Sequence, residues 1–468
     1  MKLILSQVRY FFHLLKQAVL GKEKKFTTGS INRAIVLLSV PMVLEMVMES
    51  LFVCSNLFFV SRLGAGAIAI VGATESVISF SYSIAIGLSI AASSVISRRI
   101  GEKKFKAAGA TAMQIIYIGL SISLIVSILC VVFYKEILLL VGMPEALVIE
   151  AEWFAKIMFA SILFIILRIS VNGIFRGAGN AAIAMRTLWL SNTVNIVLCP
   201  VLIFGWGIVP AYGILGVALA TAIARVIGVL YQAWHLIRRK TILSIGFQQL
   251  KFSLALTKKV LKLAITGAVQ YMIPSSSWIL MIKIVSYFGP NALAGYIIAQ
   301  RVASIATMPA WGIGNAAGIL TGQNLGANQH ARAEKSVWKA GIFNTGFLCL
   351  VALFWAFGAE PVILLFTDEP EVLKNGVLYL NYITIAYVLL GYTMVISRAL
   401  NAAGDVKVVT LLYILMFYVT QIPLSYLFGI YFDWGPKGIF TAILTSELVL
   451  AAACITVFRK GKWKHIKV

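Results

Sequence analysis

Charged side chains are scarce in this chain of 468 residues, where Asp, Glu, Lys and Arg together make up 12%. A soluble globular protein carries about 25%, so the composition excludes an ordinary soluble domain. Only three residues are aspartate (Asp368, Asp405 and Asp433), and all three fall in expected loops. A magnesium site built from paired aspartates at membrane depth is therefore excluded.

Cysteine and histidine are also few. The four histidines lie scattered at expected helix ends without ligand spacing, and no Walker phosphate-binding loop occurs. We therefore expect no metal, no cofactor and no enzymatic activity, since no catalytic constellation is recognisable. The five cysteines fall inside expected spans and are interpreted as small buried apolar side chains: Cys54, Cys130, Cys199, Cys349 and Cys454.

Long apolar runs are what the sequence does have, and 60% of its residues are hydrophobic. Each run supplies the roughly 20 residues that cross a hydrocarbon core. The pattern predicts an all-α membrane protein with twelve transmembrane helices. They are centred near residues 47, 84, 120, 164, 198, 224, 273, 308, 347, 388, 417 and 447.

The sequence also repeats itself at a spacing of 225 residues. Gly101 falls on Gly326, Gly179 on Gly404, Gly213 on Gly438 and Ala67 on Ala292. Four anchors at one spacing indicate a tandem duplication. Because each half crosses the membrane six times, we expect two six-helix lobes related by a pseudo-two-fold axis along the membrane normal, with a substrate path between them.

Lys and Arg, 40 in all, alternate in density along the loops. One side of the twelve spans holds 31 bases and four acids, and the other holds five bases and nine acids. By the positive-inside rule, both termini lie in the cytoplasm. The net charge of +23 is thus a topology signal with a secondary role in contacting anionic membrane lipids, and we expect no nucleic-acid partner.

These patterns divide the chain into five segments. Residues 1–33 form a cytoplasmic amphipathic arm, in which residues 6–20 are expected to be a short helix on the leaflet surface. Residues 34–240 form the N-lobe, 241–258 a cytoplasmic linker, 259–458 the C-lobe, and 459–468 a basic cytoplasmic tail.

Ionisable side chains within spans are the best functional candidates, because burying a charge in a membrane is costly unless it is paired or wet. The acids Glu45, Glu49 and Glu447 are the candidates for cation coupling. Glu75 and Lys283 lie within about two turns of the outer surface, where they can also snorkel. For Arg225 and Arg301 the sequence leaves open a structural ion pair or a place on the cavity wall.

Glu45 and Glu49 lie four residues apart and so share one helix face. Their mutual repulsion favours proton uptake by one of them. At roughly 1.5 Å per residue, Glu45 lies about 13 Å from the cytoplasmic side and Arg168 about 12 Å. We therefore predict an ion pair between Arg168 and Glu45, which leaves Glu49 to titrate; a purely structural Glu–Arg pair is the alternative.

Helix breakers and polar residues also fall inside spans. Pro41 and Pro274 are candidate helix bends, because proline frees a backbone carbonyl. The cavity-lining candidates, which could equally form hydrogen bonds between helices, are Asn56, Asn172, Asn192, Asn195, Gln270, Asn315 and Arg301.

Several segments resemble the multidrug and toxic compound extrusion (MATE) family, of the MOP flippase superfamily. They are residues 51–65 (LFVCSNLFFVSRLGA), 71–74 (VGAT), 172–180 (NGIFRGAGN), 213–221 (GILGVALAT), 322–327 (GQNLGA) and 398–405 (RALNAAGD). The resemblance covers nearly all of residues 30–458. It implies a V-shaped, outward-facing cavity between two lobes, alternating access, and export driven by a proton or sodium gradient.

The sequence departs from the family where coupling is expected. Many members carry an Asp in span 1, and the matching triplet here is Ser55-Asn56-Leu57. The second-half carboxylates of the sodium-linked branch fall on Pro274 and Leu390. The family's usual coupling set therefore does not transfer. Three alternatives stay open: Glu45 and Glu49 replace the usual coupling carboxylates, Glu447 replaces them, or the protein is not coupled to a cation in the usual way.

The resemblance favours a secondary antiporter in the inner (cytoplasmic) membrane that exports small amphipathic or cationic compounds in exchange for H+ or Na+. We expect it to act as a monomer. The alternative is a flippase of the same superfamily for lipid-linked oligosaccharides or lipids, in which Arg168, Arg225 and Arg301 would bind pyrophosphate. A membrane-embedded enzyme is a third and weaker interpretation.

Overall fold

The computed structural model describes residues 2–21, 26–238, 242–243, 245 and 247–466, and over these residues the chain is built from helices and their connections. A helix satisfies all its backbone groups internally, which a lipid environment requires. The first-half helices are α1 (Lys2–Leu20), α2 (Ile31–Ser61), α3 (Ala65–Gly101), α4 (Phe105–Val132), α5 (Tyr134–Leu140), α6 (Glu145–Glu150), α7 (Glu152–Ala160), α8 (Ile162–Gly177), α9 (Ala181–Phe204) and α10 (Ile214–Ile237).

The second half begins after a short 3-10 turn, η1 (Phe247–Leu250). Its helices are α11 (Leu254–Ser286), α12 (Pro290–Gly326), α13 (His330–Leu364), α14 (Pro370–Ala402), α15 (Val406–Ile414), the π-helix η2 (Leu415–Gln421), α16 (Ile422–Tyr426), the π-helix η3 (Leu427–Tyr431), α17 (Gly435–Arg459) and the 3-10 turn η4 (Lys462–His465).

Eleven spans within the described part of the chain are long and apolar enough to cross a membrane. Two of them combine several elements: α7 with α8, and α15 through η3. The remaining long helix, α12, has 37 residues but carries polar residues such as Gln300, Arg301 and Asn315, which lower its hydropathy. With α12 the described helices account for the twelve spans predicted from the sequence, and the protein is a multi-pass membrane protein.

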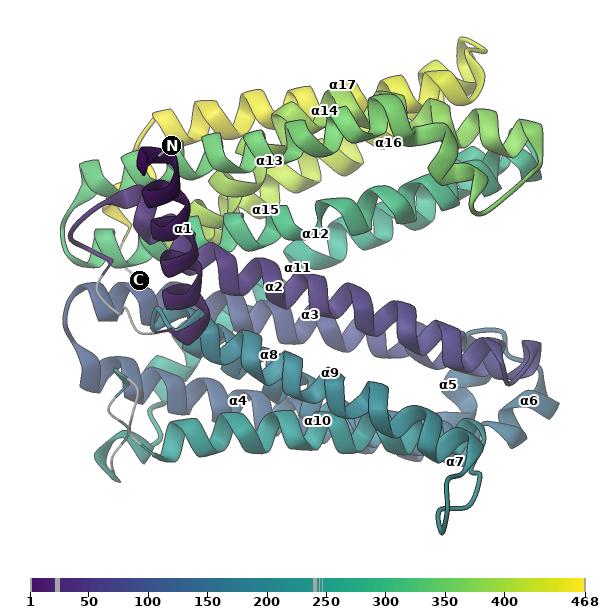
Figure 1. Ribbon diagram of the computed structural model, residues 1–468, viewed down its shortest axis with the longest axis horizontal. Coiled ribbons are helices and arrows are strands. Elements are labelled where there is room, and N and C mark those ends of the chain that lie inside the picture. The colour runs from purple at the N-terminus through teal and green to yellow at the C-terminus, as the bar shows by residue number, and fades with distance from the viewer. Residues whose placement is uncertain (1, 22–25, 239–241, 244, 246, 467–468) are drawn as a thin grey trace. The chain divides into compact units, whose positions relative to one another are not determined.

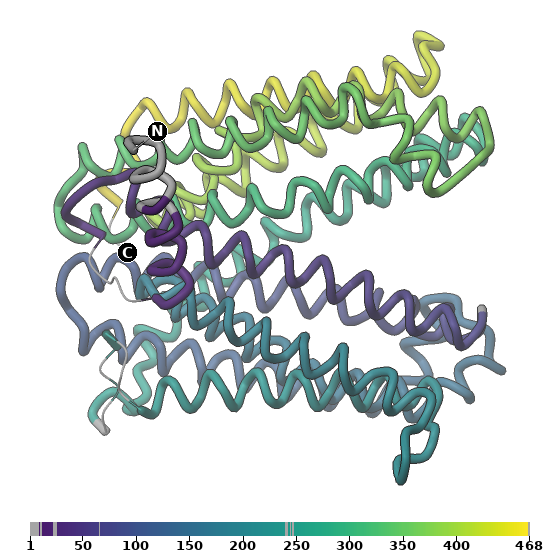
Figure 2. Tube along the Cα trace, viewed as in Figure 1, coloured from purple at the N-terminus to yellow at the C-terminus, as the bar shows by residue number. Residues whose placement is uncertain are grey.

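The helices form two compact units. The amino-terminal unit comprises Val19–Lys24 and Leu44–Ala268, and the carboxy-terminal unit comprises Met1–Ala18, Lys25–Val43 and Val269–Val468. Within each unit the long helices run alongside one another (Figures 1 and 2). The first part of α2 thus groups with the carboxy-terminal unit, and the first part of α11 with the amino-terminal unit, whereas the lobe boundaries expected from sequence stay predictions.

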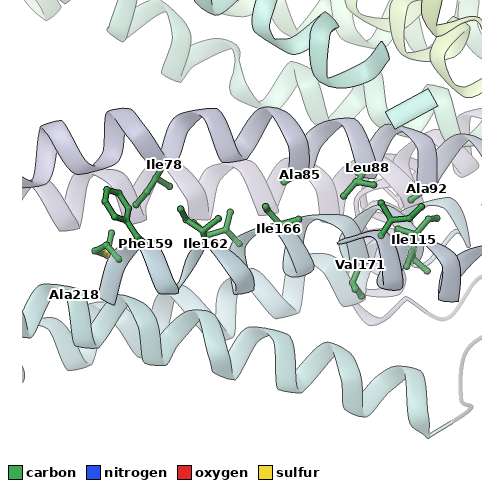
Figure 3. Close-up of a cluster of buried hydrophobic side chains, with 14 of the residues drawn as sticks. Ile78, Ala85, Leu88, Ala92, Ile115, Phe159, Ile162, Ile166, Val171 and Ala218 are labelled. Atoms are coloured by element: carbon green, nitrogen blue, oxygen red, sulfur yellow. The ribbon is translucent and has the colours of Figure 1, made fainter. Parts of the chain in front are cut away.

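Each unit has its own apolar core. In the amino-terminal unit, Ile78 and Ala85 of α3 lie beside Ile162 and Ile166 of α8 (Figure 3). Small residues allow these two helices to approach closely: a Cβ on Gly173 would lie 2.6 Å from Ser89 Oγ. The core of the carboxy-terminal unit is richer in aromatic side chains, such as Tyr296, Trp355, Tyr379, Tyr387 and Phe440.

The backbone confirms the internal repeat. Left-handed residues recur 225 positions apart: Gly64 (φ 96°) and Gly289 (φ 93°), Lys103 (φ 59°) and Asn328 (φ 57°), Gly179 (φ 82°) and Gly404 (φ 93°). Helices α3 and α12 also begin and end at this spacing. Duplicated turns therefore hold duplicated helices in the same order.

The predicted match of Gly213 with Gly438 is wrong. Gly213 (φ 55°) precedes α10 as Gly435 (φ 63°) begins α17, so the spacing here is 222. A Cβ on Gly216 would lie 2.4 Å from the Leu202 carbonyl oxygen, and a Cβ on Gly438 would lie 2.5 Å from that of Phe428. The two glycines therefore occupy equivalent close contacts. The connection before the last helix is six residues longer in the first half (205–213 against 432–434). The span before it is two residues shorter there (181–204 against 406–431), and α17 begins one residue earlier than α10 relative to the matched glycine, so the spacing falls by three.

Candidate functional site

Helix α8 carries three polar side chains at intervals of four residues: Arg168, Asn172 and Arg176. This spacing stacks them on one helix face. Arg168 and Asn172 are buried and Arg176 is nearly so. Polar side chains at such depth require partners within the protein, and α2 and α10 supply them.

Glu45 of α2 is buried against the last turns of α8. Its Oε1 accepts hydrogen bonds from Arg176 Nη2 at 3.1 Å and from Asn172 Nδ2 at 3.2 Å. The predicted pairing of Glu45 with Arg168 is therefore wrong. The prediction assumed that both helices enter the membrane at one level and run upright. The observed partner lies eight residues further along α8, a displacement of about 12 Å along the helix axis.

Gln232 of α10 extends this network. Its Nε2 donates to Asn172 Oδ1 at 2.6 Å and to the backbone carbonyl of Arg168 at 3.1 Å. Because Asn172 donates to Glu45 and accepts from Gln232, both sides of its amide are used. Glu45 is thus part of a chain of hydrogen bonds that joins α2, α8 and α10.

Glu49, one turn from Glu45, lies at a different place: the wall of a small polar cavity inside the amino-terminal unit. The cavity has a volume of about 20 Å³, enough for one water molecule. Its lining residues come from α2, α3, α8, α9 and α10 and are Glu49, Phe52, Tyr82, Arg168, Ser191, Asn192, Asn195, Thr221, Ala224 and Arg225.

Arg225 is the second base on this wall, and it is held from two sides. Its Nη2 lies 3.8 Å from Glu75 Oε1, and its Nη1 donates to Ser161 Oγ at 2.5 Å. Arg168 has its Nε buried without a hydrogen-bond partner among the described residues. Two acids, Glu49 and Glu75, thus face two bases, and the ionised cluster carries no net charge.

The predicted cavity-lining residues separate into groups. Asn192 and Asn195 line the cavity; Asn195 Nδ2 donates to Thr221 Oγ1 at 3.1 Å, and Asn192 Nδ2 to the Met48 carbonyl at 3.3 Å. Asn172 belongs instead to the Glu45 network. The cavity of Glu49 does not include the other candidates, whose roles stay predictions: Asn56, Gln270, Asn315 and Arg301.

The proline predictions are tested only in part. Pro41 and Pro274 both lie inside continuous helices, α2 and α11. Each helix therefore lacks one backbone donor at that point. A bending role for these positions stays a prediction.

Several contributors were missed from the sequence. Arg176 and Gln232 complete the Glu45 network, and the pairing of Glu75 with Arg225 balances the cavity. The interval of four residues between Asn172 and Arg176 was a signal available in the sequence. Nothing in the sequence indicated Gln232, because its role depends on how α10 packs against α8.

Glu447 of α17 lies in the carboxy-terminal unit. Its side chain is buried, and its Oε2 has no hydrogen-bond partner among the described residues. No ion pair of the described part of the chain ends on Glu447. The buried acids Glu45 and Glu447 therefore differ: Glu45 is paired with Arg176, whereas Glu447 has no ion-pair partner among the described residues.

Comparison with known proteins finds the family model MatE twice, over residues 41–201 and 267–427. The probable multidrug resistance protein YpnP of Bacillus subtilis (strain 168) is 28% identical over 458 residues, 96% of this chain and 99% of that protein. The probable multidrug resistance protein YoeA of the same organism is 29% identical over 424 residues, 89% and 90% of the two chains. The crystal structure of MATE in the straight conformation is 26% identical with a TM-score of 0.87, over 94% and 97% of the two chains.

Proposed function

Because the chain belongs to the MatE family, we propose that it is a secondary antiporter that exports small amphipathic or cationic compounds in exchange for protons. Its relatives YpnP and YoeA are named as probable multidrug resistance proteins, which supports a broad range of small substrates. Thirteen methionines and a 12% share of aromatic residues offer adaptable apolar surface for such compounds. The two lobes would alternate in access, with both termini in the cytoplasm.

The observation that carries the coupling proposal is the position of Glu49. Glu45 is engaged by Arg176 and Asn172, whereas no ion pair among the described residues ends on Glu49. Glu49 is half-buried on the wall of a cavity that has room for water. A carboxylate that is wet and unpaired is the one that can take up and release a proton during transport.

The charge of the cavity also favours a proton over sodium. Asn195 and Thr221 supply oxygen atoms of the kind that bind alkali cations, but Arg168 and Arg225 stand on the same wall. Two positive charges on the wall would repel a sodium ion bound beside them. A proton adds its charge to Glu49 itself, where the nearby bases oppose it less than they oppose a separate ion.

Coupling follows from the charge that the proton adds. With both acids ionised the cluster is neutral, and protonation of Glu49 makes it positive. Binding of a cationic substrate in the amino-terminal unit is then less favourable, because the cluster is positively charged. Proton binding would shift the lobes toward the state that releases substrate, in proportion to its different affinity for the two states.

A lipid-linked oligosaccharide flippase is less well supported. It would need uncompensated bases to hold pyrophosphate, and Arg225 is already paired with Glu75. Arg168 shares its cavity with Glu49. We therefore favour the exporter.

Transport into inside-out vesicles tests the proposal, with proton and sodium gradients imposed separately. Wild-type protein should accumulate a fluorescent cationic dye under the proton gradient. Uptake by Glu49→Gln should be at least ten-fold lower than uptake by wild type, a factor within the usual range of coupling between two binding sites. Glu150→Gln, which alters an exposed acid of the same unit, is the control. Normal uptake by Glu49→Gln would refute the role of Glu49, and uptake driven only by sodium would refute proton exchange.

A further inference from the structure

A groove opens on the surface of the carboxy-terminal unit, between α11 and the span that runs from α15 to η3. It has a volume of about 570 Å³, within the usual range of ligand pockets of about 300–1,000 Å³. Leu280 and Ile284 line it from α11, and Ile422, Leu424 and Leu427 line it from the other span. An apolar groove of this size on an exposed surface marks a place where another apolar molecule packs.

The irregular helix that forms one wall explains why the groove is there. Pro423 stands between two π-helical stretches, η2 and η3. Proline cannot donate a backbone hydrogen bond, and a π-helical turn holds more residues than an α-helical one. This span therefore does not present the regular ridges that would fill the space beside α11.

The groove lies near the ends of both spans. Before it, Ser276 of α11 and Tyr418 of η2 form a hydrogen bond of 2.6 Å between their hydroxyl groups. Residue numbers rise on both spans from this contact to the groove, so the two spans run in the same direction. Helix α11 ends at Ser286, three residues beyond Lys283, and η3 ends at Tyr431, four residues beyond the last lining residue. The groove therefore reaches the depth at which the hydrocarbon core gives way to lipid headgroups.

Lys283 brings a positive charge to this part of the groove. Its side chain is exposed, and no ion pair within the described ranges of the chain ends on it. Tyrosines near the same span ends are exposed as well, namely Tyr287, Tyr426 and Tyr431. Exposed tyrosines at span ends are typical of the headgroup layer. An ammonium group at that depth can bind a lipid phosphate.

We propose that the groove holds an acyl chain of an anionic phospholipid and that Lys283 binds the phosphate of that lipid. The lipid would act as a structural partner of this unit, because its chain packs against both α11 and the irregular span. A zwitterionic lipid carries its own cation beside the phosphate, so it gains less from Lys283 than an anionic lipid does. One lysine near an anionic headgroup favours it about five-fold. The site requires only a membrane around the protein, so it does not depend on proton exchange.

Photo-crosslinking with two lipids tests the assignment. Phosphatidylglycerol and phosphatidylcholine with the same diazirine-bearing chain are added separately to the full-length protein in neutral detergent, and mass spectrometry maps the labelled peptides. Peptides that contain residues 280–284 or 422–427 should be labelled about five-fold more by phosphatidylglycerol. Lys283→Gln should lose this preference and Lys283→Arg should keep it. Lys437→Gln, which removes an exposed lysine of the same unit outside the groove, should match wild type.

A further variant tests the groove separately from its charge. Leu280→Trp fills the groove and leaves Lys283 in place, so labelling of the groove peptides by both lipids should fall, while labelling elsewhere stays constant. Both positions are exposed, so the variants should fold, and thermal unfolding verifies this.

The outcomes separate this inference from its alternatives. Equal labelling by the two lipids in wild type, or an unchanged preference in Lys283→Gln, would show that Lys283 extends to water and would refute the site. Labelling that is not enriched in the groove peptides would refute it as well. If an excess of a transported dye abolishes the labelling and an excess of unlabelled phosphatidylglycerol does not, the groove belongs to the substrate and the lipid is refuted. Failure of wild-type protein to transport under any gradient would refute the proposed function and leave the lipid site standing.

Discussion

Arg176 donates from Nη2 to Oε1 of Glu45 at 3.1 Å, and the acid is the more deeply buried of the two, with its side chain 3% exposed against 15%. Asn172 donates to the same oxygen. The pair links α2 to α8 within the amino-terminal unit. Both single substitutions remove the ion pair, but the loss of stability should depend on which of the two partners is removed.

Arg176→Gln should destabilise the protein more than Glu45→Gln. The first change strands a buried carboxylate, which costs about 3–5 kcal/mol. The second strands a guanidinium that is closer to solvent and leaves an amide to accept from Asn172, so about 1–3 kcal/mol is expected. Thermal unfolding in detergent measures both. Equal losses, or a larger loss for Glu45→Gln, would contradict the assignment.

The pair between Arg225 and Glu75 predicts the opposite order. Here the base is the buried partner, with its side chain 8% exposed against 42% for Glu75. Glu75→Gln should therefore cost more stability than Arg225→Gln, and the double variant should cost less than the sum of the two. A double-mutant cycle of unfolding free energies measures the coupling. Additive losses would show that the two charges do not stabilise each other.

The sequence predicted much of the fold, because apolar runs and a fixed spacing report helices and duplication directly. It also singled out Arg168 and Asn172 as candidate site residues, which the structure places on one face of α8. It did not predict the partner of Glu45, because that depends on how far α2 is displaced along α8, and residue spacing carries no such information. The sequence could not show that the spacing changes from 225 to 222 before the last helix. Glycine stands at both 435 and 438, so Gly213 has a matching glycine at either spacing.

Contact between α3 and α8 predicts a strict requirement for glycine at position 173. A Cβ there would lie 2.6 Å from Ser89 Oγ and 2.7 Å from Ser89 Cα, which is closer than packed atoms approach. Gly173→Ala should separate the helices at a cost of about 1–3 kcal/mol or more. Gly72→Ala is the control within α3, because its new Cβ would meet nothing within 4 Å. Similar melting temperatures for the two variants would refute the close packing.

The carboxyl-terminal tail should be anchored by its tryptophan and not by its charges. Trp463 in η4 is buried, stacks on Phe458 at 4.7 Å and donates from Nε1 to the Phe458 carbonyl at 2.8 Å. Lys464 makes a 2.6 Å ion pair with Glu334, but both side chains stay partly exposed.

Trp463→Ala should therefore cost about 3–5 kcal/mol, as expected for removing a large buried ring. Lys464→Ala should cost less than about 1 kcal/mol, because an exposed ion pair contributes little. Thermal unfolding, with limited proteolysis of the tail as a second readout, compares the two. A larger effect of Lys464→Ala would mean that electrostatic attraction to α13 holds the tail, and the buried ring would then be a consequence of that attachment and not its cause.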